Sequence, residues 1–213
     1  MSSMRLDIYH SQIPNNAVYL TFNGLGSGEN TLRSLGSGKQ VTLKRGTVRR
    51  NAILLFRENG ESFTNEMEMS SKLAGALSLR SHFRYLVTYD SAANVLAFVP
   101  SPISIAQAKL KSNYKANLNR ILIGYELLSK LGIPENRSQS VVCRSQSASI
   151  RLTVSSPSNL FDNGLGLDPA VIRALHLVPD SHVTLSYNQN TKVLAFKAAK
   201  PPGSAQNRTG GAS

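Results

Sequence analysis

The sequence predicts a mainly β protein with short helices, an α+β chain folded as two tandem small β-barrels. The first reason is an internal repeat, because residues 69–98 return without insertion or deletion as residues 167–196. At this constant offset Tyr89 aligns with Tyr187, and both copies end in Val-Leu-Ala-Phe. A gap-free match of that length indicates a duplication. We therefore expect two domains of about a hundred residues each in this chain of 213 residues.

The second reason is a unit of one strand, one short helix and two further strands, about 40 to 50 residues long, that occurs twice in each half. In the first half, alternating β-forming residues predict a strand at 17–22. A helical piece at 30–35 ends at Gly36, as a C-cap glycine would end it. The remaining elements are expected to be strands at 39–44 and 52–56, a strand from residue 67, a helix at 72–77 capped by Ser70, and strands at 83–89 and 94–100.

The second half repeats this order. A strand at 121–123 precedes a helix at 125–131 that Gly132 ends, and the next strands are expected at 140–143 and 149–154. The returning repeat has Asp168 as N-cap and Pro169 as the first residue of its helix. Four short strands alone would leave open edges, so we expect the two units of each half to interleave into a closed barrel.

These elements predict the domain boundaries. The first barrel is expected at residues 1–101 and the second at residues 118–199. Residues 102–117 have helical composition and are interpreted as a linker, while residues 200–213 are expected to form a disordered tail. The residues shared by the two repeat copies are apolar and predict the core. Those that differ, such as Arg84 where the second copy has His182, are expected to be exposed.

Composition narrows the class of protein. With 41% hydrophobic residues and no apolar run near the eighteen that a membrane helix needs, we expect no membrane span. The N-terminus shows no apolar h-region, so cytoplasmic synthesis without a secretory signal is expected. A single cysteine, Cys143, excludes an internal disulfide framework and is expected to lie buried on a strand.

Charge indicates the kind of partner. The net charge is +12, and residues 102–213 carry 13 Lys and Arg against 5 Asp and Glu. Such an excess favours an acidic partner: nucleic acid, an anionic cell-wall polymer or an acidic protein surface.

Sequence motifs for catalysis or cofactors are not found. The run Leu35-Gly36-Ser37-Gly38-Lys39 lacks the first glycine and the final Ser or Thr of a phosphate-binding loop. The four histidines are not spaced as metal ligands, and no serine lies in a nucleophile elbow. We therefore expect a non-enzymatic protein without cofactor or metal.

Two basic groups remain as candidate polyanion-binding residues. The first is a hairpin that carries Lys39, Lys44, Arg45, Arg49 and Arg50. The second lies near the linker and consists of Lys109, Lys111, Lys115 and Arg120. Both could neutralise phosphates or carboxylates and release counterions. The alternative for each is a solvated basic face that only aids solubility.

The segments SSKLAGALSL (residues 70–79) and YLVTYDSAANVLAF (residues 85–98) carry a resemblance. Together with LRSLGSGKQVTLKRG (residues 32–46), they resemble the N-terminal region of the YheC/YheD family, described as endospore coat-associated. The resemblance covers residues 17–100 and, through the duplication, 118–198. In that family an ATP-grasp region follows, whereas here the first domain is repeated. The resemblance thus implies a fold and a spore or envelope setting, but no activity.

A looser resemblance connects IGYELLSKLGI (residues 123–133) with AbrB-like and double-psi barrels, some of which bind DNA. Two hypotheses follow. The first is a non-catalytic structural or interaction protein of the spore or envelope that binds an acidic partner. The second is an AbrB-like DNA-binding regulator in which Arg45, Arg49 and Arg50 contact phosphates.

Overall fold

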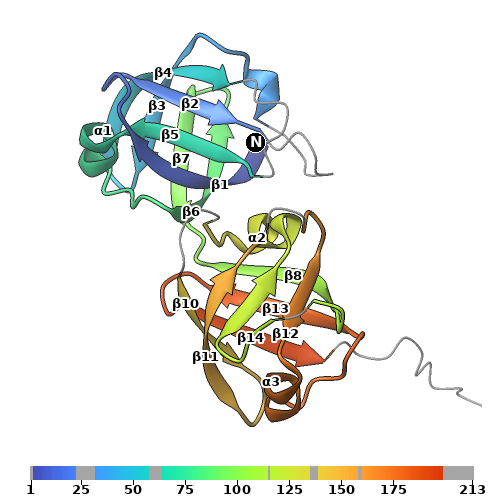
Figure 1. The fold of residues 1–213 in the computed structure, drawn as a ribbon. Helices are drawn as coiled ribbons and strands as arrows, with labels where there is room; N and C mark the ends of the chain where they lie inside the picture. The colour runs from blue at the N-terminus through green and yellow to red at the C-terminus, as the bar shows by residue number, and fades with distance from the viewer. Residues whose placement is uncertain are drawn as a thin grey trace, which may run out of the picture.

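The chain folds into two closed β-barrels, which confirms the predicted fold class. The computed structural model describes residues 2–22, 32–57, 64–114, 116–134, 139–157 and 160–198. Within these residues each barrel has seven strands, and Figure 1 shows the two barrels one above the other. None of the described helices is long and apolar enough to cross a membrane.

The first barrel follows the order β1-β5-β2-β4-β3-β7-β6, and pairing of β6 with β1 closes it. Its elements are β1 (Ser2–Ser11), β2 (Ala17–Thr21), the 3-10 helix η1 (Arg33–Leu35), β3 (Lys39–Arg45), β4 (Val48–Arg57), β5 (Glu66–Ser70), α1 (Ser71–Ala76), β6 (Phe83–Asp90) and β7 (Val95–Pro100). The units β2-η1-β3-β4 and β5-α1-β6-β7 have the predicted order of strand, short helix and two strands.

The second barrel follows the order β10-β11-β9-β12-β8-β13-β14. Its elements are β8 (Ile103–Leu110), β9 (Arg120–Ile123), α2 (Tyr125–Leu131), β10 (Ser140–Arg144), β11 (Ser149–Ser155), β12 (Gly164–Leu167), α3 (Pro169–Ala174), β13 (His182–Asn188) and β14 (Val193–Ala198). When seven is subtracted from each strand number, this order becomes β3-β4-β2-β5-β1-β6-β7. Around the closed barrel, each strand then has the same two neighbours as in the first barrel. The duplication therefore includes the complete barrel topology.

The repeated turns keep the same backbone path although their residues differ. A non-glycine residue with positive φ is uncommon. Among the residues that the structure describes, such residues occur as pairs at the repeat offset: Ser78 (φ 52°) and His176 (51°), His82 (55°) and Asp180 (55°), Asn94 (53°) and Lys192 (57°). Backbone geometry is thus retained where side-chain identity is not.

Local signals for helix ends are confirmed. Ser70 Oγ accepts a hydrogen bond from Leu73 N (3.1 Å), and the Asp168 carboxylate accepts one from Ala170 N (2.7 Å). Gly132 ends α2 in the left-handed conformation, with φ of 68°.

The shared residues of the repeat form two separate cores. Leu96 and Leu194 are fully buried, and Tyr89 and Tyr187 lie in the first and second core respectively. Cys143 is buried on β10, as expected, and burial raises the pKa of its thiol to about 12. The prediction is therefore correct for these leucines and tyrosines and for Cys143. It is wrong for the shared alanines, since Ala174 is exposed and Ala97 is only partly buried.

Two strands were not predicted. Residues 1–16 contain β1, and the expected helical linker at 102–117 is wrong because its first part is β8. The Ala, Gln and Lys residues of β8 favour a helix, but every second residue is buried, as a strand with one buried face requires. Pairing with β13 overrides local propensity. Residues 30–31 of the expected first helix and the predicted tail at 200–213 lie outside the described residues.

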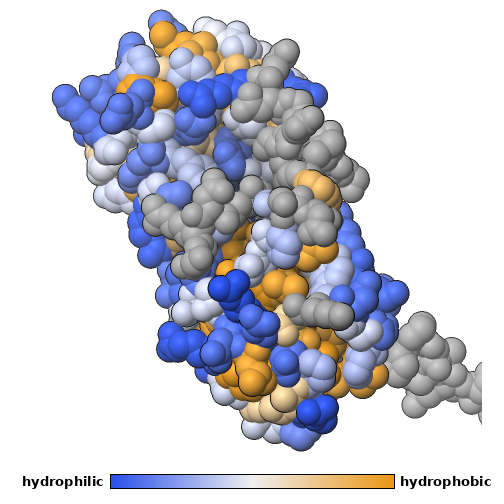
Figure 2. All heavy atoms as spheres, viewed as in Figure 1, coloured by the Kyte–Doolittle hydropathy of each residue, from blue (hydrophilic) through white to orange (hydrophobic). Residues whose placement is uncertain are grey.

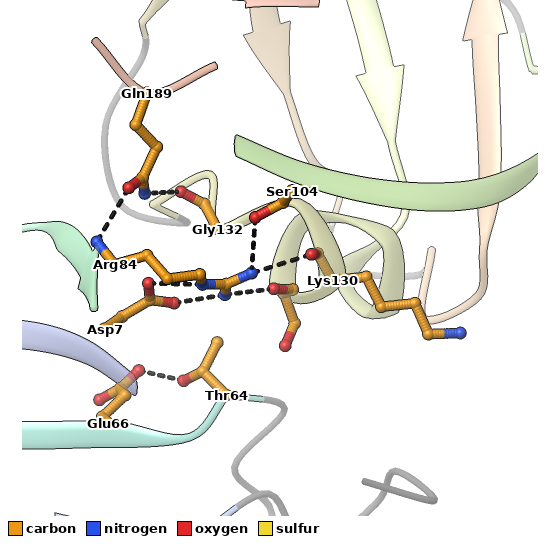
Figure 3. Close-up of polar contacts among 9 residues, drawn as sticks. Asp7, Thr64, Glu66, Arg84, Ser104, Lys130, Gly132 and Gln189 are labelled. Carbon is orange, nitrogen blue, oxygen red and sulfur yellow. Dashed lines mark hydrogen bonds and ion pairs between the residues drawn. The ribbon is translucent and has the colours of Figure 1, made fainter. Parts of the chain in front are cut away.

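The barrels are joined by Arg84, which is a second correction: it is buried, not exposed. Its guanidinium donates to both oxygens of Asp7 (2.9 and 2.6 Å) in its own barrel. The other donors reach the second barrel, at Ser104 Oγ (3.1 Å), Lys130 O (2.9 Å) and Ser129 O (2.7 Å) (Figure 3). All five N–H donors of the guanidinium thus have acceptors, which compensates for the burial of the charge.

Candidate polyanion interface

Charge is divided between two sides of the first barrel. The adjacent strands β2, β4, β3 and β7 contain no Asp or Glu, whereas they carry Lys39, Lys44, Arg45, Arg49, Arg50 and Arg57. The acidic residues of the remaining strands are Asp7, Glu66, Glu68 and Asp90. We refer to the four acid-free strands as the basic face.

The β3–β4 hairpin forms the end of this basic face. Arg45 pairs with Val48 across a turn in which Gly46 has a φ of 57°, and Lys44 lies directly opposite Arg49. Lys44 points outward, because successive residues of a strand face opposite sides and the preceding residue, Leu43, is fully buried. Arg49 is paired with Lys44 and therefore points to the same side. Like charges directly opposite each other repel, so an anion placed between them is favoured.

Two cations of the basic face have structural partners. Arg45 donates to the carbonyls of Leu77 (3.2 Å) and Ser78, beyond the end of α1. Arg57 forms an ion pair with Glu68 (2.6 Å). Arg45, a predicted polyanion-binding residue, therefore binds a helix end instead of projecting freely.

The other predicted residues of the hairpin group have no acidic partner among the described residues, because no carboxylate there lies within ion-pair distance of Lys39, Lys44, Arg49 or Arg50. Lys39 Nζ donates to Tyr89 Oη (2.8 Å), and Arg50 Nη1 donates to the Arg49 carbonyl (2.8 Å). Lys39 and Lys44 lie at opposite ends of β3, about 17 Å apart along an extended strand.

The second predicted group does not form one cationic patch. Lys109 and Lys111 border a pocket of about 390 Å³ that also contains Glu126 and Asp162. Arg120 is exposed on β9 beside Thr153 of β11, and Lys115 lies outside the described residues.

Lys111 has an internal counterion. Its ammonium contacts Asp162 and donates to Tyr114 Oη (3.2 Å), and the hydrogen bond to Asp162 is the main cause that raises the pKa of Lys111. Burial alone would raise the pKa of Asp162. Hydrogen bonds from Lys111, Gly164 N and Tyr114 outweigh burial, so the pKa of Asp162 lies below its ordinary value.

A basic face was missed in the second barrel. Strands β9, β11, β10 and β14 also contain no Asp or Glu, and they carry Arg120, Arg144, Arg151 and Lys197. Arg144 lies beside Ala195, as Lys44 lies beside Ala97 in the first barrel. Strands β9, β10 and β11 precede the gap-free repeat, and loops of different length shift their offset from the corresponding strands of the first barrel. Aligning them would have revealed Arg144 as the counterpart of Lys44.

On the side of the molecule that Figure 2 shows, hydrophobic residues lie in separate groups among hydrophilic ones.

In the part of the chain that the structure describes, no group of three or more His, Cys, Asp or Glu side chains is placed to hold a metal.

Comparison with known proteins gives no relative for this chain. No protein-family model matches it, and no curated protein or solved structure is significantly similar to it. The interpretation of the basic faces therefore depends on their geometry.

Proposed function

We propose that the protein is a non-catalytic binding module for an acidic polymer, which it contacts through the basic face of the first barrel. The observation that carries this proposal is the hairpin geometry: Lys44 and Arg49 lie directly opposite each other, on strands without acidic residues. The resemblance to the YheC/YheD family adds the proposed setting, a spore or cell envelope.

The chemistry of the proposed contact is electrostatic. Each lysine or arginine that neutralises a charge on a polymer releases condensed counterions, so affinity falls as salt concentration rises. The equivalent basic face of the second barrel offers a second contact area to a long polymer. Two contacts by one chain strengthen binding when the polymer reaches both.

The test is binding to polyphosphate as a function of salt, for the wild type and for a Lys44→Ala/Arg49→Ala variant. The control is Arg5→Ala/Lys72→Ala, which removes the same charge from exposed positions on β1 and α1. We expect the hairpin variant to lose affinity and to show a shallower salt slope, while the control stays close to wild type. Equal affinity of the two variants would contradict the proposal.

A second candidate is the AbrB-like DNA-binding regulator. The observation in its favour is that Arg49 and Arg50 are exposed near the end of a two-stranded ribbon, an element that the major groove of DNA admits. Duplex DNA in the same titration separates the candidates. Binding to DNA at least tenfold tighter than to polyphosphate of matched charge would favour the regulator.

A further inference from the structure

A groove of about 470 Å³ lies on the basic face of the first barrel. Its polar lining consists of a threonine hydroxyl and four carboxamides, from Thr42, Asn16, Gln40, Asn51 and Asn94. None of the described residues that line it is charged or aromatic. The groove therefore offers hydrogen bonds rather than charge.

Strand register directs Gln40, Thr42 and Asn51 outward. Thr42 lies opposite Asn51, and Gln40 lies opposite Ile53. Between them along β3, Val41 points inward and is buried. Because paired residues share a face of the sheet, Thr42 and Asn51 project together from the barrel wall.

Internal hydrogen bonds hold part of the lining in place. Thr42 Oγ1 donates to Asn51 Oδ1 (3.2 Å), which leaves the amide protons of Asn51 to donate elsewhere. Asn94 accepts from Tyr89 Oη (3.0 Å) and donates to the Gln40 carbonyl (2.6 Å). The carboxamide of Gln40 has no hydrogen bond to any described residue, so it is available to a ligand.

Cations lie near both ends of the groove. Lys44 and Arg49 follow Thr42 and Asn51 toward the hairpin turn. At the other end, Lys39 precedes Gln40, and its ammonium binds the same Tyr89 hydroxyl that donates to Asn94. A ligand along β3 would thus meet charge, then hydrogen-bonding groups, then charge.

The barrel fold does not require these carboxamides, as the second barrel shows. Val142 stands at the position of Thr42 and Arg151 at the position of Asn51, because each pair is joined across the hairpin in the same way. Lys192 replaces Asn94: its carbonyl accepts from Val142 N, as that of Asn94 accepts from Thr42 N. The same backbone therefore forms without the polar lining.

We infer that this groove binds an acidic glycan, a polymer that carries both hydroxyl and carboxylate groups. A carboxamide offers donors and an acceptor side by side, which suits sugar hydroxyls, while Lys39, Lys44 and Arg49 suit the carboxylates. This inference rests on the proposed function and names the class of its polymer. Single-stranded nucleic acid fits less well, because the lining offers no aromatic ring for base stacking.

The experiment compares polymers that separate charge from hydroxyl groups. Polygalacturonate has both, polyphosphate of matched charge has no hydroxyl groups along its chain, and dextran has no charge. We expect wild-type protein to bind polygalacturonate about tenfold more tightly than polyphosphate and to bind dextran weakly. Dextran binding equal to that of polygalacturonate, or tighter binding of duplex DNA, would overturn the inference.

Variants test the groove separately from the hairpin. Gln40→Ala/Asn51→Ala should lose about tenfold in affinity for polygalacturonate and less than twofold for polyphosphate. Asn51→Arg introduces the residue type that the second barrel has there, so the fold should tolerate it. It should weaken polygalacturonate binding but strengthen polyphosphate binding. A matched control, Ser140→Ala, changes the residue equivalent to Gln40 on β10 and should alter neither affinity.

The two proposals fail in different ways. If the groove variants lower the affinity for both polymers equally, or for neither, the glycan inference is wrong, while polyanion binding through the hairpin stands. If Lys44→Ala/Arg49→Ala binds polyphosphate as wild type does, the proposed function itself is wrong.

Discussion

Gly132 lies directly against the guanidinium of Arg84: a Cβ at Gly132 would be 2.9 Å from Arg84 Cζ and 3.0 Å from Nε. The same glycine has a φ of 68° and ends α2. Two independent constraints therefore favour glycine at this position. One is the left-handed backbone, and the other is the close packing between the barrels.

Gly132→Ala should lower the free energy of unfolding by about 2 to 4 kcal/mol, because it combines left-handed strain with displacement of a buried ion pair. Urea unfolding followed by circular dichroism measures this loss. The matched control is Gly46→Ala. Gly46 has a similar φ of 57°, but a Cβ added there would meet no atom within 4 Å, so only the strain should appear, about 1 kcal/mol. Equal losses would show that the contact with Arg84 is unimportant.

Arg84→Met should lower the free energy of unfolding by about 3 kcal/mol, because it leaves the buried carboxylate of Asp7 without its counterion. Arg80→Met is the control, since Arg80 also crosses to the second barrel, at Asn190 Oδ1 (2.7 Å), but is exposed. Its effect should be below about 1 kcal/mol. Asp7→Leu/Arg84→Met should be less destabilised than Arg84→Met alone, since no unpaired charge remains. A larger loss in the double variant would contradict this explanation.

The ion pair between Asp162 and Lys111 should make stability depend on pH. The pKa of Asp162 is lowered in the folded chain, so its contribution is present above the ordinary carboxylate pKa and is lost as pH falls through the folded value. Because 45% of the Asp162 side chain is exposed, we expect a small effect. Urea unfolding between pH 2.5 and 7 should show wild type and Asp162→Asn converging at low pH. A difference that is constant with pH would contradict the prediction.

Cys143 should be unreactive in the folded chain. Burial raises the pKa of its thiol from 9.0 to about 12, so the reactive thiolate is scarce and the sulfur is covered. Alkylation by iodoacetamide at pH 8 should be at least about a hundredfold slower than in urea-unfolded protein. As pH rises from 9 toward 12, the unfolded thiol ionises before the folded one, so stability should fall. Cys143→Ala measures the background alkylation. Similar alkylation rates in the folded and the urea-unfolded protein would contradict the burial of the thiol.

Much of the fold follows from local sequence. The alternation in β2, the serine cap of α1 and the Asp168-Pro169 start of α3 involve residues within a few positions of one another. The gap-free repeat also predicted that the chain contains two barrels. Local patterns failed for β8, where Ala106 and Ala108 favour a helix but face a core formed by strands more distant in sequence.

The candidate site was predictable in composition but not in arrangement. The sequence showed five cations around one hairpin, yet only the strand register places Lys44 opposite Arg49 and sends Arg45 to the end of α1. Arg144 was missed because its equivalence to Lys44 depends on pairing with β14.

The sequence alone therefore determined the duplication, the helix-capping residues and the leucine, tyrosine and phenylalanine core positions that the two repeat copies share, since these depend on near neighbours and on periodicity. Only the tertiary structure decided which charged side chains are paired, buried or exposed. Arg84 and Asp7 are 77 residues apart, and their pairing exists because β1 and β6 are neighbours in a closed barrel that the second barrel covers. Whether a cation is exposed or buried depends on such distant partners, and local sequence does not contain them.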